Sequence, residues 1–138
     1  MLLMNPRSVR FGSATWENVA SVAVARVAGK SVVAWGDAGP YPTFVDVPEQ
    51  TVMATVKQLL LREDVSSPKP GDSGTLVVFT APATSDFGRK KMSASAVVTG
   101  VSYDLEATKA VRTIVLALVS SDGASDPWTV VDGGSEGV

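Results

Sequence analysis

The stretch Trp16-Glu-Asn-Val-Ala-Ser-Val-Ala-Val-Ala-Arg-Val27 indicates the class of fold, because it alternates like a β-strand yet is small and apolar on both faces. Val22 and Val24 share one face with Ala20, while Ser21, Ala23 and Ala25 share the other. A solvated strand would carry polar side chains on one of its faces. We therefore expect this strand to be covered on one side by the protein's own core and on the other by something else.

The rest of the chain continues as short strands separated by turns. Valine is the commonest residue, and the 11 Thr, 12 Gly and 8 Pro that accompany it are typical of strands punctuated by turns. We expect one β domain at residues 1–131 and a flexible tail rich in Gly, Ser and acid at 132–138. Further strands are predicted at 30–35 (a hairpin with 16–27 through Ala28-Gly29), 49–61, 75–80, 90–103 with a bulge at Gly100, 110–120 and 128–131.

Residues 49–62 fit two kinds of secondary structure. Their apolar residues alternate as in a strand, but Val52, Val56 and Leu59 would also line one side of a helix. We favour a strand to about Leu61, followed by a short helical turn through Arg62-Glu63-Asp64 that stops before Pro68.

The composition excludes several classes of function. The chain contains no Cys and no His, so it lacks the usual zinc ligands and the commonest general base. Its net charge of -2 provides no excess of cations for binding phosphates, so we expect no specific affinity for DNA or RNA. The longest uncharged stretch, Ser73–Ser85, has 13 residues, whereas a membrane helix needs about 20. We expect no membrane association, and Met1–Met4 is too short for the core of a signal peptide.

Two motifs that could carry chemistry are better explained by turns. Gly71-Asp72-Ser73-Gly74 resembles the nucleophile segment of chymotrypsin-like proteases, but that serine needs a histidine base. A pair of Ser73 with Lys69 is unspecific in a segment rich in Pro and Gly. The carboxylates near the C-terminus lack the spacing of a calcium-binding loop, which favours turn chemistry for Asp122, Asp126 and Asp132. We predict no catalysis, no cofactor and no metal site.

The segment Gly36–Pro48 is predicted to be a loop that contacts another chain. It is too rich in Pro for an interior strand, and a loop of this length in a small domain usually has a function. Tyr41, Phe44 and, further along, Trp128 stand among Gly, Pro and Asp, where contact with another chain is more typical than burial. Trp35, in contrast, is predicted to be a core residue.

Charge is distributed unevenly along the second half of the chain. Residues 89–112 carry a balance of +3, and residues 113–138 carry a balance of -4. Arg89-Lys90-Lys91 is more typical of a solvated strand end than of a phosphate site. The two regions could therefore attract neighbouring copies of the chain.

Several stretches together resemble the tail tube proteins of tailed bacteriophages. They are Lys69-Pro-Gly-Asp-Ser-Gly-Thr-Leu-Val-Val78, the strands within Gly88–Asp104 and Ala110–Val130, and the loop Gly39-Pro-Tyr-Pro-Thr-Phe44. The resemblance covers most of the chain, and it lies in patterns of strands and turns. It implies a β-sandwich or barrel-like fold with one short helix, an architecture that the type VI secretion tube protein shares.

The resemblance also implies a function and a set of partners. Six subunits would close into a ring, and rings would stack into a tube in the virion tail that conducts genome DNA without binding it specifically. The other partners implied are a tape-measure protein and, if the tail contracts, a sheath, with synthesis in the host cytoplasm. Ring-stacking candidates are Asp37, Tyr41, Pro42, Phe44 and Asp46; subunit-interface candidates are Val22, Val24, Arg89, Lys90 and Trp128; lumen-lining candidates are Ser93, Ser95 and Thr99.

Two other classes of function compete with a tube subunit. The first is a monomeric β-sandwich that binds a carbohydrate or protein, with Trp35, Tyr41 and Trp128 as a stacking platform. The second, an enzyme using Ser73 or the Glu63-Asp64 pair, is disfavoured because no partner for acid and base roles is evident.

Overall fold

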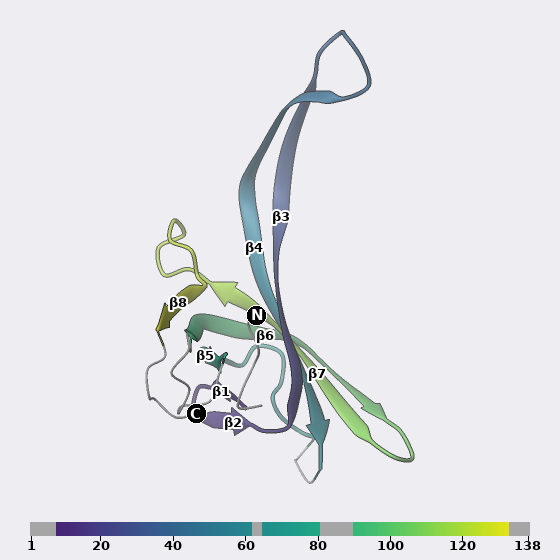
Figure 1. Ribbon diagram of the computed structural model, residues 1–138, viewed down its shortest axis with the longest axis vertical. Helices are drawn as coiled ribbons and strands as arrows, with labels where there is room; N and C mark the ends of the chain where they lie inside the picture. The colour runs from purple at the N-terminus through teal and green to yellow at the C-terminus, as the bar shows by residue number, and fades with distance from the viewer. Residues whose placement is uncertain (1–7, 62–64, 81–89, 133–138) are drawn as a thin grey trace.

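A computed structural model describes residues 8–61, 65–80 and 90–132, and these form one open antiparallel sheet of eight strands (Figure 1). The strands are β1 (Val9–Phe11), β2 (Ala14–Trp16), β3 (Val19–Trp35), β4 (Pro42–Leu60), β5 (Ser73–Phe79), β6 (Lys90–Leu105), β7 (Ala110–Val119) and β8 (Thr129–Asp132). The prediction of a mainly β protein is confirmed. No helix occurs among these residues, and the helical turn expected at Arg62-Glu63-Asp64 lies outside them.

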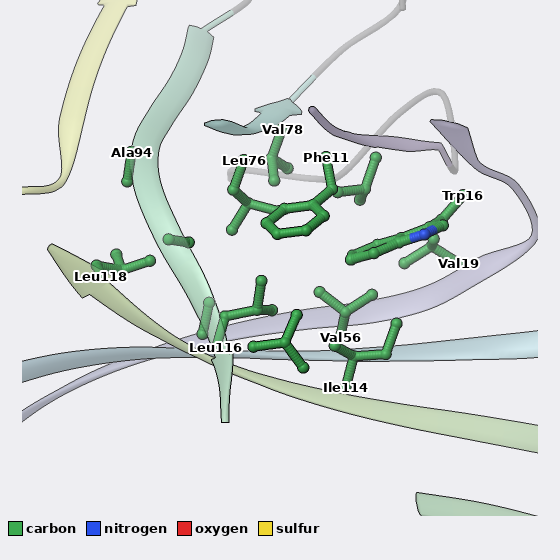
Figure 2. Close-up of a cluster of buried hydrophobic side chains, with 14 of the residues drawn as sticks. Phe11, Trp16, Val19, Val56, Leu76, Val78, Ala94, Ile114, Leu116 and Leu118 are labelled. Atoms are coloured by element: carbon green, nitrogen blue, oxygen red, sulfur yellow. The ribbon is translucent and has the colours of Figure 1, made fainter. Parts of the chain in front are cut away.

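The sheet curls around its own apolar core. Its strands follow the order β2-β1-β5-β6-β7-β4-β3, and β8 pairs with the first residues of β6. Side chains of β1, β2 and β5 face those of β4 and β7, as Figure 2 shows for Phe11, Trp16 and Leu76 on one side and Val56, Ile114 and Leu116 on the other. The curled sheet thus resembles a sandwich, with apolar burial as the dominant source of its stability.

The predicted strands in the second half of the chain are confirmed. β5, β6 and β7 lie at the predicted positions to within two residues, and the predicted edge near the C-terminus forms β8. The register between β6 and β7 shifts between Val98 and Gly100, which confirms the predicted bulge. Asp132 ends β8 opposite Lys90, and the rest of the predicted tail lies outside the described residues.

The hairpin predicted at Ala28-Gly29 is wrong. β3 continues through these residues to Trp35, and the register shift beside Gly29 makes it part of a bulge. Ala-Gly lacks the Asn or Asp that favours a two-residue turn, so the alternating pattern on either side prevails. The chain turns instead at residues 36–41, and the predicted loop from Pro42 to Pro48 belongs to β4.

Beyond the body of the protein, β3 and β4 form a long two-stranded arm (Figure 1). We define the arm as residues 27–51. β4 pairs with β7 from Met53 onward, whereas residues 27–51 pair only with each other in the described part of the chain. The prolines of β4 therefore lie where β4 is itself an edge, which is where proline is tolerated in a sheet.

Buried polar groups attach the segment before β5 to the sheet. Arg112 of β7 is 4% exposed and donates through Nε (3.1 Å) and Nη2 to Oε1 of Gln58 on β4. Its Nη1 donates to the carbonyl oxygen of Ser67 at 2.6 Å, and Nε2 of Gln58 donates to the carbonyl oxygen of Glu17 at 2.8 Å. One guanidinium thus joins two strands and a loop, as buried polar groups require.

Candidate assembly surface

The arm exposes large apolar side chains. Trp35 is 62% exposed, Tyr41 80% and Phe44 55%, and the arm also exposes Val27, Val32 and Val45. A two-stranded hairpin is only marginally stable by itself in water, and an exposed apolar surface of this kind marks a site of interaction. The prediction that Trp35 is a core residue is wrong, since the strand that carries it leaves the body.

The structure brings the ring-stacking candidates together at the tip of the arm. Asp37 and Tyr41 lie in the turn, and Pro42, Phe44 and Asp46 follow in β4, which pairs with the end of β3. The tip is hollowed, with a volume of about 290 Å³ lined by Gly36, Ala38, Gly39, Tyr41, Pro42 and Thr43. The segment predicted to contact another chain therefore combines acidic, aromatic and backbone groups at the point farthest along the arm.

The lumen-lining candidates lie on the face of the sheet opposite the core. Ala94, Ala96 and Val98 of β6 are buried in the core, so Ser93 and Ser95 point the other way. We call this the second face. By the registers of β4, β6 and β7, it also carries Thr55, Val97, Ser102, Thr113, Val115 and Ala117, all exposed or half-buried.

The second face is rich in hydroxyl groups. Thr99 lies exposed at the bulge and donates through Oγ1 to the carbonyl oxygen of Val115 at 3.2 Å. Where β7 ends, the surface is hollowed to about 340 Å³ and lined with hydroxyls from Thr75, Ser93, Ser95, Ser120, Ser121, Ser125 and Thr129. This surface offers small apolar and neutral polar groups with few charges.

The subunit-interface candidates do not form one surface. Val22 and Val24 lie on β3 opposite Val56 and Ala54, and Val22 already packs against the core. Trp128 also packs against the core, far along the chain from them, and precedes β8, whose partner is the segment that begins at Lys90. Arg89 lies outside the described residues.

An ion pair at the base of the arm was not predicted from the sequence. Both guanidinium ends of Arg26 donate to the carboxylate of Asp126, at 3.1 and 2.9 Å, and both side chains are about half exposed. Hydrogen bonds from Arg26 and from the Trp128 backbone N–H lower the pKa of Asp126. The pair joins β3 to the loop between β7 and β8, across a hollow of about 570 Å³.

The same loop is organised by Asp122, as the turn interpretation predicted. Its Oδ1 accepts hydrogen bonds from the backbone N–H groups of Ser125 (2.8 Å) and Ala124 (2.9 Å), and its Oδ2 accepts one from Ser125 Oγ (2.9 Å). These donors, the Ser125 backbone N–H foremost, lower the pKa of Asp122 well below its usual range. Among the described residues, no cluster of three or more acidic side chains could hold a metal ion.

Acidification is expected to release this loop only at a pH well below 4. A lowered pKa means that the folded loop favours the carboxylate, so its contribution to stability is complete above the unfolded value of about 3.9 and disappears as the pH falls through the folded value. We expect the Asp122 carboxyl carbon, followed by NMR, to titrate well below pH 3.9 and to shift upward in Ser125→Ala, which removes one donor. A midpoint at or above 3.9 would contradict the hydrogen-bonded loop.

The protease-like motif serves the local backbone. Gly71 adopts a φ of 99°, and its N–H donates to the Val98 carbonyl oxygen at 2.8 Å. A Cβ at Gly74 would approach the backbone N of Gly12 to 3.1 Å, so glycine permits the close contact of two segments. Asp72 accepts a hydrogen bond from the Lys69 N–H at 2.9 Å, as in a turn. The turn interpretation explains each of these residues.

No known protein family matches the sequence, and no curated protein is significantly similar to it. Within the described residues, no helix is sufficiently long and apolar to cross a membrane. Function is therefore argued from the arm and from the two faces of the sheet.

Proposed function

We propose that this chain is a structural subunit that assembles into six-membered rings, and that the rings stack into the tail tube of a tailed bacteriophage. The observation that carries the proposal is the arm, whose three aromatic side chains are more than half exposed and lie outside the subunit's own core. A second copy of the chain would cover them. The tube would conduct genome DNA, and the protein would have no catalytic role.

Burial of the arm supplies the energy for stacking. Each aromatic side chain at the tip gains roughly 1.5–3 kcal/mol when it is transferred from water to an apolar contact. Obligate assemblies bury more than about 2,000 Å² per interface, and the arm adds two exposed strand faces to the exposed body. Asp37 and Asp46 at the tip would orient the arm toward basic groups of the next ring.

The second face supports the role of a conduit. A channel lined with Lys and Arg would bind phosphates by releasing counterions and would hold the DNA. Ser93, Ser95 and Thr99 instead present hydroxyls among small apolar neighbours, in a chain whose net charge is -2. We place this face toward the lumen and the curled side of the sheet away from it. A tape-measure protein would occupy the channel before DNA does, and a contractile tail would add a sheath.

The geometry does not favour the monomeric binding module. Its platform requires Trp35, Tyr41 and Trp128 to form one stacking surface. Trp35 and Tyr41 lie at the tip of the arm, whereas Trp128 packs against the core of the body. The aromatic side chains of the arm therefore face outward without the third member.

Removing the aromatic anchors of the arm should shorten the tubes. We expect the double variant Tyr41→Ala, Phe44→Ala to fold normally, because both side chains are exposed, and to yield at most a tenth of the wild-type tube length in negative-stain micrographs. A loss of only about 2 kcal/mol per contact already reduces each association constant more than tenfold. Circular dichroism checks the fold.

Val65→Ala is the matched control for this double variant. Val65 is 54% exposed, almost the same as Phe44, but it lies on the body. We expect Val65→Ala to form tubes of wild-type length. Long tubes at wild-type yield from the double variant would mean that the arm does not stack rings.

A further inference from the structure

The outer edge of β3 is a free template for strand pairing. β3 ends the strand order of the sheet, so one side of its backbone has no partner strand among the described residues. It runs for 17 residues without a proline or an acidic residue. Proteins usually protect so long an edge with prolines, charges or a covering segment, because an exposed one pairs with other chains.

The other edge of the same arm is protected. The arm portion of β4 contains Pro42 and Pro48, which have no N–H to donate, together with Asp46 and Glu49. The two edges of one hairpin thus differ in their capacity to pair. This difference singles out β3 as the edge that accepts another strand.

A second free edge lies at the end of β6. The ladder between β5 and β6 ends at Ser73 opposite Val97, with Gly71 and Asp72 still bonded to Val98. Beyond the bulge, Gly100–Leu105 pairs with β7 on one side only, as far as the described residues show. Leu105 is 69% exposed. This stretch contains no proline and can accept a strand.

The directions of the strands suit a closed ring. β6, β7, β4 and β3 are consecutive and antiparallel, so β6 and β3 run in opposite directions. A rotation about an axis along the strands preserves direction, so β6 of the next copy would run antiparallel to β3. Pairing of two different edges is heterologous and closes into a ring when the rotation allows.

Charge favours this pair of edges over β3 with itself. β3 carries Arg26 and Lys30 as its only charges, and Gly100–Leu105 carries only Asp104. Two copies of β3 paired about a two-fold axis would place basic strands against each other, whereas β6 offers an acid. Small residues on the second face, Ala23 and Ala25 on β3 and Gly100 on β6, leave room for close approach.

We propose that β3 of one copy pairs antiparallel with Gly100–Leu105 of β6 in the next copy, and that this contact joins the subunits of a ring. The inference rests on the proposed function for its ring, but it names the two edges that meet. It places Ala23, Ala25 and Val27 on the second face beside the second-face residues of the neighbouring β6.

Cysteine cross-linking tests this pairing, because the chain has no cysteine of its own. Ala23→Cys, Ala25→Cys and Val27→Cys are each combined with Ser102→Cys, so that the three pairs cover successive registers. A disulfide forms only where Cα atoms come within about 7 Å. After mild oxidation, we expect at least one pair to give a ladder of bands from monomer to hexamer on a non-reducing gel, and reductant to collapse it.

Two controls and one further measurement complete the design. Thr51→Cys with Ser102→Cys carries its cysteine opposite Val27, on the protected strand of the arm, and should give no ladder. Ala25→Cys alone should remain monomeric on the gel. If the variants fail to fold, amide hydrogen exchange of the wild-type protein provides the test, with protection of residues 20–27 and 100–105 expected on assembly.

Each outcome distinguishes this inference from the proposed function. Rings in micrographs without any cross-linked ladder, or without protection of either edge, would overturn the pairing and leave the tube in place. Cross-linked dimers from Ala25→Cys alone would show that β3 pairs with itself, and would also overturn it. Absence of both rings and cross-links would overturn the pairing and the tube together.

Discussion

Arg112→Ala is expected to lower the free energy of unfolding by about 3 kcal/mol, because it leaves two buried acceptors, Gln58 Oε1 and the Ser67 carbonyl oxygen, without a donor. Each unsatisfied group costs about 1–3 kcal/mol, and the benefit of removing a buried charge offsets part of this loss. The measurement is urea denaturation at one fixed protein concentration, since assembly itself raises the apparent stability.

A double-mutant cycle assigns this loss to the polar cluster. Gln58→Leu removes the acceptor, and in that background Arg112→Ala should cost at least 1 kcal/mol less than in the wild type, because contacting groups are not additive. Lys109→Ala is the control for loss of a cation, since Lys109 pairs with Glu106 at 3.7 Å and is largely exposed; it should change stability by at most about 0.5 kcal/mol. Equal effects of Arg112→Ala in both backgrounds would contradict the cluster.

Ile114→Ala is expected to destabilise the subunit by about 4 kcal/mol. Ile114 is fully buried on β7, between Val56 and Leu116 in the core (Figure 2). Truncation of a buried Ile removes its transfer energy and leaves a cavity, at a cost of about 2–5 kcal/mol. The urea midpoint at fixed concentration should fall accordingly, with an unchanged slope.

Val115→Ala separates the two faces of the sheet. Val115 follows Ile114 but points to the second face, where it is only half-buried. We expect it to cost less than about 1 kcal/mol in the isolated subunit. A loss as large as that of Ile114→Ala would mean that the second face is a core of the single chain, and would contradict its placement in the lumen.

Alternation along the chain was sufficient to predict most of the sheet. β5, β6 and β7 combine period-2 patterns with clear turn residues, and the bulge was marked by Gly100 between two valine-rich halves. Each of these signals is local. Strand pairing order is not, which is why the open edges of β3 and β6 became visible only in the fold.

The arm was missed because a local turn signal competed with a longer pattern. Ala28-Gly29 suggested a hairpin, yet β3 and β4 pair along most of their length, and many cross-strand contacts prevail over one weak turn. Trp35 was then assigned to the core on its size alone. Its exposure is informative, since a large aromatic side chain outside the core indicates a partner.

The ion pair of Arg26 with Asp126 had no local signal. The two residues are 100 positions apart, and each stands in an unremarkable sequence context. The ring-stacking candidates, in contrast, were predicted as a group because aromatic side chains among Pro and Gly are locally recognisable. Contacts between distant segments are the part of the candidate surface that single-sequence reasoning does not reach.

Sedimentation velocity of the purified chain, at rising concentration and neutral pH, determines whether the subunit completes itself by joining copies. We expect a species of about six times the 14.3 kDa chain mass, followed by larger stacked particles that micrographs show as hollow rings and tubes. A single 14.3 kDa species at every concentration, with the arm exposed and no particle visible, would contradict the proposal that this protein builds a tube.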